Sequence, residues 1–488
     1  MKYLLYLILI QCINILYCME IQGFYESQFG RSYESDAFKW NIWDPNFYLE
    51  TRIQGSPNQY SNYYIKFYPY KDYNESNRPV SVLSESNISF RDEKNGKGFN
   101  VTLFTRESQH YWLDGSMLNL INTGIVNNDG NGQGVRFDLW DNSDRSISYV
   151  FSDFSQGGGD DIHLLRYRQS YLNKKLNSGI FLLRKNYSTG NLYDYNQVLA
   201  TDLNIFMGRY YFTTEIAVSD VPSETMIREL NNDYEFDEVL KSNIAIKSEV
   251  RGMRIGTPKL GYIFFTPGIY SFGHTYRNYM GDNQSNRYGY WLNSYYLVPE
   301  RAMTMVANYS YYQKIVPDTI TVFIDSLFSK EILDPVSNLY TEIYTEFING
   351  FKGKIAFNKK DESWQGQLYK HYDIYSELSV ENSLAKLLAQ FKIKDIGETL
   401  EKYISGIELS VNLNEKWKFF TRGMIVNDRV GSRYSMFTEL QYRTAGNTEL
   451  YIQYGPSYWG QYGLVNDDGF ASIGSMRKEI RLIIKGWF

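Results

Sequence analysis

Histidine is the most versatile catalytic side chain in this sequence, and the chain has only four: His110, His163, His274 and His371. His163 shares parity with Asp161 on a segment that alternates like a strand, so an acid–histidine pair that faces an internal lumen is conceivable there. The other three fall in or beside long loop-like stretches, where a surface histidine is the ordinary role. No local signature identifies a nucleophile beside any of them. The sequence therefore predicts no catalytic residue.

The sequence also contains no convincing motif for binding a metal ion or a phosphate group. Residues 127–132 (Asn-Asn-Asp-Gly-Asn-Gly) place oxygens at alternate positions, and Asp138 falls where a calcium loop has its bidentate acid. The first position is Asn rather than Asp, so a turn-rich loop is the better interpretation. The glycine run 157–159 lacks the lysine and helix of a phosphate-binding loop. We expect no metal site and no cofactor.

A larger set of charged and tyrosine side chains occupies every second position of the apolar stretches. Placed this way, the charges would face an aqueous lumen and set its electric field. Lysine and arginine form the majority, which suits polar neutral solutes such as sugars, or small anions, better than cations. The alternative is that these side chains are merely solvated and satisfied by one another. The set comprises Glu50, Arg52, Lys66, Arg91, Arg106, Arg136, Asp138, Lys247, Glu249, Arg251, Glu342, Glu346, Lys352, Lys354, Lys386, Lys392, Glu408, Arg422 and Glu439, with Tyr48, Tyr64, Tyr68 and Tyr211 on the same faces.

These positions require strands, and alternation with a period of two runs almost from end to end. Clear examples are residues 47–53, 134–139, 210–218 and 405–413, which are rich in β-branched and aromatic residues. Short and long connections alternate between the segments, as in outer-membrane barrels, whereas a soluble sandwich has no reason to alternate so steadily. The sequence predicts an all-β fold, a single large antiparallel transmembrane β-barrel. We count about 25 segments, one too many around Met303, Val322 and Ile343, and take about 24, in the range of about 22 to 26.

Composition agrees with this architecture. The 488 residues include 45 tyrosines, and aromatic residues make up 17% of the chain. The mean hydropathy of −0.43 excludes a polytopic helical membrane protein, but a barrel keeps half of each strand polar. The net charge of −5, with both signs abundant, gives no sign of nucleic-acid binding.

The first 18 residues predict a cleaved secretory signal peptide. A lysine at position 2 precedes an apolar core that is too short for a transmembrane helix. Both cysteines, Cys12 and Cys18, lie in this leader, so an exported chain cut after Cys18 has no disulfide to stabilise it. The remaining residues, 19–488, are expected to form one barrel domain.

The last ten residues, 479–488, are the clearest single strand. Ile480, Leu482, Ile484 and Phe488 share one parity and the charged residues lie on the other, a pattern that an edge strand of a soluble sheet would also show. Its length suits a tilted membrane strand. The terminal aromatic residue, with apolar residues stepping back by twos, resembles the C-terminal signature of Gram-negative outer-membrane β-barrel proteins. The resemblance implies an outer-membrane location, contact with outer-membrane lipid, and recognition of Phe488 by the barrel-assembly machinery.

These observations favour a porin-like channel that passes small hydrophilic solutes such as sugars through an outer membrane without enzymatic activity. A surface antigen or adhesin, with the long loops as the functional surface, is one alternative. A barrel hydrolase is the other. The sequence also leaves open whether a loop, such as residues 220–241 or 266–289, fills the lumen.

Overall fold

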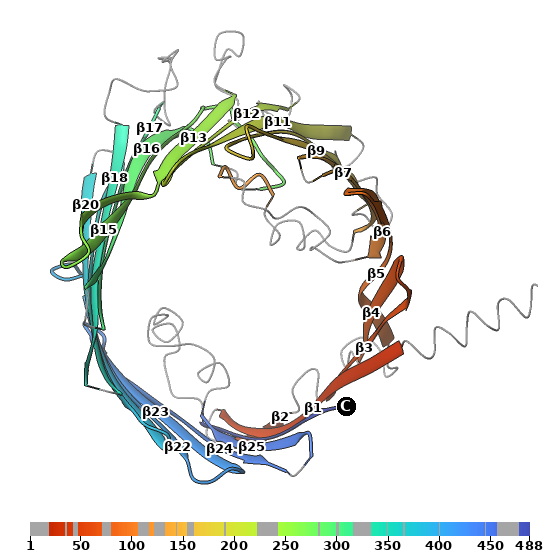
Figure 1. Ribbon diagram of the computed structural model, residues 1–488. Helices are drawn as coiled ribbons and strands as arrows, with labels where there is room; N and C mark the ends of the chain where they lie inside the picture. Colours follow the sequence, from red (N-terminus) through yellow and green to blue (C-terminus); the bar gives the residue numbers. More distant parts are fainter. Residues whose placement is uncertain are drawn as a thin grey trace, which may run out of the picture.

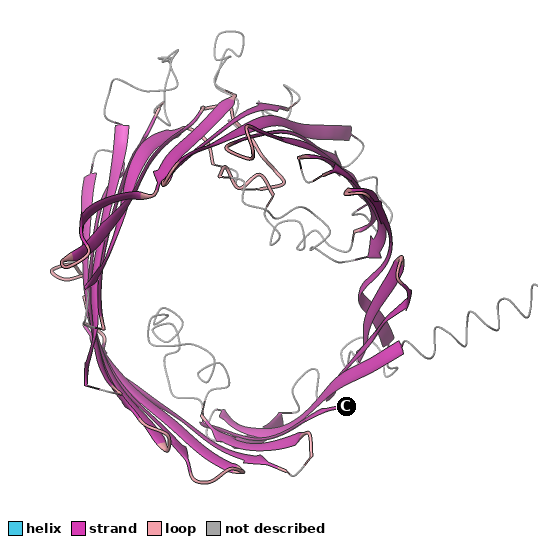
Figure 2. Ribbon diagram, in the orientation of Figure 1, coloured by secondary structure: helices cyan, strands magenta, loops and turns pink. Residues whose placement is uncertain are grey.

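The computed structural model describes residues 19–34, 37–41, 47–70, 80–105, 117–121, 132–142, 144–153, 161–189, 192–221, 243–281, 284–298, 302–315, 333–348, 350–364, 367–399, 401–444, 446–455 and 478–488. The predicted signal peptide lies outside these ranges. Within them, every regular element is a β-strand (Figure 2). No helix long and apolar enough to span a membrane occurs in the described ranges.

The strands form one sheet in chain order. They are β1 (Met19–Glu34), β2 (Ala37–Asn41), β3 (Phe47–Asn58), β4 (Ser61–Tyr70), β5 (Val80–Lys94), β6 (Lys97–Thr105), β7 (Gln133–Asp141), β8 (Arg145–Asp153), β9 (Asp161–Tyr171), β10 (Leu176–Thr189), β11 (Leu192–Met207), β12 (Tyr210–Asp220), β13 (Ile244–Arg251), β14 (Met253–Thr257), β15 (Gly261–Phe272), β16 (Arg287–Val298), β17 (Met303–Lys314), β18 (Leu333–Ile348), β19 (Phe351–Trp364), β20 (Gln367–Glu381), β21 (Ala385–Lys394), β22 (Lys402–Asn412), β23 (Trp417–Asp428), β24 (Gly431–Arg443), β25 (Thr448–Tyr454) and β26 (Lys478–Trp487).

The sheet closes on itself because its first and last strands pair. β26 lies antiparallel to β1, with Phe24 opposite Trp487 and Tyr33 opposite Lys478, and the result is a ring (Figure 1). Apart from β2 with β3 and β13 with β14, consecutive strands pair with one another in antiparallel register. A closed ring has no free sheet edge, so the backbone polar groups of the strands are satisfied within the wall.

The 26 strands of the described residues occupy 24 strand positions around the barrel, which we call staves. Two of the staves are each formed by two shorter strands. β2 and β3 follow one another along the same side of β1. β13 and β14 both pair with β15, and the break between them falls at Gly252. Gly252 has φ +82°, and a side chain there would meet the carbonyl oxygen of Arg209. The all-β fold, the antiparallel barrel and the predicted count of about 24 strands are confirmed.

Alternating exposure separates the two faces of the wall. On β6, Leu103 is 52% exposed, whereas its neighbour Phe104 is 5% exposed. Large apolar side chains lie exposed at every second position around the ring, and the residues between them point inward. This is the arrangement of a barrel whose outer surface faces lipid. Examples of the exposed set are Ile88, Phe137, Leu139, Ile180, Leu199, Ile216, Ile269, Leu292, Ile355, Leu378, Ile407, Ile425 and Leu482.

Three stretches that look like long loops in the sequence are mostly strand. Residues 30–46 contain the end of β1 and all of β2, and residues 187–195 and 359–371 contain the ends of β10, β11, β19 and β20. The pairing continues beyond the apolar belt, where neither face needs apolar side chains, so the alternation signal fades although the strand does not. In the ring β17 pairs directly with β18, while the surplus segment around Val322 lies outside the described residues.

Candidate channel wall and constriction

The predicted lumen charges lie on the face opposite the exposed apolar residues. On β7, Arg136 and Asp138 alternate with Phe137 and Leu139, both of which are exposed outward. The same holds for the predicted charges on the other described strands, including Glu50 and Arg52 on β3, Lys66 on β4, Arg91 on β5, Arg251 on β13, Glu342 on β18 and Arg422 on β23. Arg106 lies outside the described residues.

Most of these charges are arranged in acid–base pairs. Glu50 is nearly buried and bonds both Arg52 on its own strand and Lys66 on the next. Glu408 and Arg422 face one another in register on β22 and β23. Pairing inside a polar lumen lowers the net field that each charge contributes. The pairs are Arg52–Glu50 at 2.6 Å, Lys66–Glu50 at 3.3 Å, Arg136–Asp138 at 2.8 Å, Lys354–Glu342 at 2.8 Å, Arg251–Glu249 and Arg422–Glu408.

Several inward acids were missed by the sequence analysis. Glu93 bonds Arg91 at 2.7 Å, Glu381 lies 3.7 Å from Lys352, and Glu26 lies 3.0 Å from Lys485 across the closing seam. Glu93 and Glu381 sit near strand ends, where the alternation is weak, whereas Glu26 lies in the middle of β1. These acids reduce the basic majority of the predicted set without removing it, so the expected preference for anions stays a prediction.

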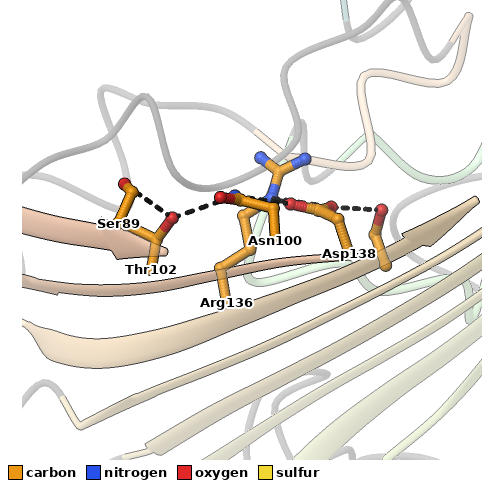
Figure 3. A network of polar contacts seen from close by, with 6 residues as sticks. Ser89, Asn100, Thr102, Arg136 and Asp138 are labelled. Atoms are coloured by element: carbon orange, nitrogen blue, oxygen red, sulfur yellow. Dashed lines mark hydrogen bonds and ion pairs between the residues drawn. The ribbon is translucent and has the colours of Figure 1, made fainter. Parts of the chain in front are cut away.

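A polar network joins four strands on one arc of the inner wall (Figure 3). The hydroxyls of Ser89 on β5 and Thr102 on β6 lie 3.0 Å apart, and the Asn100 amide donates to Thr102 at 3.1 Å and to Asp138 at 3.4 Å. Arg136 donates from Nε to both carboxylate oxygens of Asp138, at 2.8 and 2.9 Å. The Ser148 hydroxyl on β8 donates to Asp138 at 2.7 Å, so the network runs from β5 to β8.

Another arc of the inner wall is apolar and covered. Inward side chains of β6, β8 to β13 and β15 form a buried cluster, and two described segments lie over it, residues 117–121 and 273–281. Both segments run inside the ring, beside β9 and β12 (Figure 1). Apolar burial holds them to the wall. The wall contributes Phe104, Val150, Ile162, Leu164, Phe181, Leu183, Val198, Ala200, Ala217, Ala245 and Phe272, and the covering segments contribute Leu118, Leu120, Ile121, Tyr276 and Met280.

Buried hydrogen bonds fix both segments in register with the wall. The Glu215 carboxylate accepts the Leu118 amide at 2.9 Å. Asn196 accepts the Tyr279 amide at 3.0 Å and donates to the Arg277 carbonyl at 3.1 Å. Hydrogen bonds between side chain and backbone in a buried setting are costly to break, because the donor and acceptor would then be buried without partners.

The two segments are also tied to each other. The Asn278 amide donates to the Leu120 carbonyl at 3.1 Å, and Gly281 lies so close to the first segment that a Cβ there would be 2.0 Å from the carbonyl oxygen of Asn119. Burial raises the pKa of the Tyr276 phenol well above its usual range, and the nearby Glu215 carboxylate adds to this. The phenol therefore stays neutral at physiological pH. The segments form one ordered layer that narrows the ring on this side, and we call residues 117–121 and 273–281 the inner layer.

The histidines form no catalytic constellation among the described residues. His163 does approach Asp161 at 3.6 Å, and Tyr149 Oη lies 2.8 Å from its Nδ1. All three share parity with the exposed Leu165, however, so the pair faces outward and the conceivable lumen site is wrong. His371, near the start of β20, lies 2.8 Å from Asp395, which directly follows the end of β21. His110 lies outside the described residues. No group of three or more His, Cys, Asp or Glu residues in the described ranges is placed to hold a metal.

Phe488 closes the ring. Its backbone amide and carbonyl bond the carbonyl and amide of Gly23 at 3.0 and 2.8 Å. Its ring lies directly over Gly23, where a Cβ would be 1.9 Å from Cζ. On the inner side of the same seam, Trp487 packs against Phe24 with ring centroids 5.5 Å apart. The terminal aromatic residue thus has a structural role at the seam, which the alternation pattern alone did not indicate.

Comparison with known proteins gives no relative by sequence. No family model and no curated protein matches the chain. Solved structures match over 96% of it: the siderophore receptor PirA from Pseudomonas aeruginosa (10% identity, 80% of that chain, TM-score 0.46) and the ferric enterobactin receptor PfeA from the same organism (9%, 81%, 0.45). The translocation pore of the P pilus usher PapC also matches (9%, 99%, 0.40).

The architecture itself defines the class. Only helices and closed barrels satisfy all backbone groups within a bilayer, and this ring carries an exposed apolar belt outside and paired charges inside. The chain is a transmembrane β-barrel protein, the class that crosses outer membranes.

Proposed function

We propose that this barrel is a channel that passes small hydrophilic solutes across the outer membrane. The observation that carries the proposal is the inner wall, where neighbouring acids and bases neutralise one another on β3, β7, β18, β19, β22 and β23. Porins of 16 to 18 strands already enclose an aqueous path, and a 24-stave ring is wider.

The inner layer supports a restricted rather than a fully open path. Its residues are packed on the wall, and each segment is hydrogen-bonded to a wall side chain, Leu118 to Glu215 and Tyr279 to Asn196, so the layer is a fixed part of the barrel. The pairing of acids with bases supports only weak selectivity between anions and cations. We propose no catalytic role for the chain.

Conductance in a planar bilayer tests the proposal. Purified protein is expected to give discrete conductance steps with a reversal potential close to zero in a salt gradient. Replacing residues 273–281 by a short glycine–serine linker removes one of the two segments of the inner layer. This change is expected to raise the conductance of each step. A bilayer that stays silent with both proteins, although each is folded and inserted, overturns the channel proposal.

A surface antigen or adhesin remains the second candidate. It is favoured by the paired ends of β10 with β11 and of β19 with β20, which continue to Thr189↔Leu192 and Trp364↔Gln367. These long hairpins offer an ordered surface beyond the membrane. Binding of the intact protein to host-cell surfaces, lost when both hairpin ends are shortened, is the result that this function predicts.

A further inference from the structure

We propose that a polar recess in the inner wall between β3 and β8 is a binding subsite for a neutral sugar. The inference rests on the proposed channel function, and it adds the class of solute. The recess has a volume of about 850 Å³. Small-molecule sites commonly have volumes of about 300 to 1,000 Å³, so a disaccharide fits this space. It is lined by Ser56, Asn58, Gln59, Tyr60, Ser61, Asn62, Ser89, Arg91, Asn100, Thr102, Arg136, Asp138, Trp140, Arg145 and Ser146.

The lining matches the hydrogen-bonding needs of a polyhydroxylated molecule. Each sugar hydroxyl both donates and accepts, and serine, threonine and asparagine side chains do the same. Ser89, Thr102 and Asn100 are already held in fixed positions by the network of Figure 3. A preorganised set of donors and acceptors loses little conformational entropy when a ligand binds.

The charges of the recess favour a neutral ligand over an anion. Two of the three arginines that line the recess are engaged with carboxylates, Arg136 with both oxygens of Asp138 and Arg91 with Glu93, while Arg145 is the third. An anion would have to compete with these carboxylates for the guanidinium groups. A sugar leaves both ion pairs in place and uses the remaining hydrogen-bonding capacity of their atoms.

Trp140 supplies the apolar surface that a sugar ring also needs. Its indole lies against Gly98 on the neighbouring strand, where a Cβ would be 2.4 Å from Cζ2. The glycine therefore lets the indole lie against the wall. The Arg91 guanidinium lies 5.1 Å from the ring centroid, and its side chain is 64% exposed. The C–H face of a sugar can pack on an aromatic ring by dispersion while its hydroxyls bond the polar lining.

The chain contains a matched control for this tryptophan. Trp291 on β16 also lies against a glycine of the neighbouring strand, Gly268. The Lys247 ammonium group lies 5.3 Å from the centroid of its ring. Trp291 does not line the recess. Trp291→Ala thus removes an equivalent aromatic surface from the wall without touching the proposed subsite.

The first experiment measures block of single-channel current by sucrose, maltose and trehalose, with gluconate as an anionic comparison. At least one disaccharide is expected to block the wild-type channel. Trp140→Ala is expected to weaken that block about tenfold, the loss typical of a buried aromatic contact, and Trp291→Ala by less than about twofold. Equal loss in both variants, or block by gluconate alone, overturns the proposal.

A second measurement is independent of conductance. Saturation-transfer NMR on the full chain in detergent detects the same sugars bound to the protein, and Trp140→Ala is expected to abolish the signal. A conducting channel without sugar signal or sugar block overturns the subsite and leaves the channel standing. A Trp140-dependent sugar signal from a barrel that is silent in bilayers supports the subsite and overturns the channel.

Discussion

At the scale of single residues, the seam between the ends of the chain depends on one glycine. The Phe488 ring occupies the space where a Gly23 side chain would be. Gly23→Val should displace the ring and weaken closure, and we expect a clear fall in the fraction of folded, heat-modifiable protein. The loss corresponds to roughly 1–2 kcal/mol of aromatic packing.

The control for this variant lies in β23. Gly423 has no atom within 4 Å of an added Cβ. Gly423→Val should therefore leave the folded fraction unchanged. Equal losses from both variants would show that any strand valine is harmful and that the contact between Gly23 and Phe488 has no special part in closure.

The sequence predicted the side chains of the wall better than their partners. Alternation placed Glu408 and Arg422 on the inner face, because period two depends only on local geometry. It did not predict that they face each other, since register between strands depends on turns that the pattern locates only approximately. Acids near strand ends, such as Glu93 and Glu381, were missed for a different reason, because the alternation is weak where a strand ends.

At the scale of elements, the inner layer is the feature with the clearest mechanical effect. A side chain at Gly281 would meet the backbone of Asn119, which cannot move aside as a flexible side chain can. Gly281→Val should separate the two segments of the layer, and we expect larger or noisier conductance steps from this variant in a planar bilayer. Gly446→Val is the matched loop control, because the nearest atom to its Cβ is 4.0 Å away. Unchanged conductance in Gly281→Val would mean that the layer does not limit the path.

The sequence contains one sign of the inner layer, which is overlooked when only the alternating pattern is considered. Residues 162–165 and 180–183 are nearly continuous apolar runs, whereas a strand with a wet inner face should alternate. A strand that is apolar on both faces is buried on both, so such runs in a barrel indicate that something covers the inside. Which segment covers it could not be predicted, because the contacts join residues far apart, such as Leu118 and Glu215.

At the scale of the whole molecule, the barrel should behave as an integral outer-membrane protein. We expect it in the outer-membrane fraction, and unheated samples should migrate differently from boiled samples on a denaturing gel, because a closed ring of 24 staves resists detergent until heated. Recovery of the full chain in the soluble periplasmic fraction, with no heat-dependent shift, would contradict the assigned class.

The closing pair has a consequence for the order of events during assembly. Every other stave meets a neighbour that is near in sequence, but β1 finds its second partner only in the last residues of the chain. A polypeptide cut short by even one strand keeps two bare edges, which are sites of aggregation and proteolysis. Closure is thus an all-or-none step that requires β26, and copies that lack this strand expose unpaired edges to proteolysis.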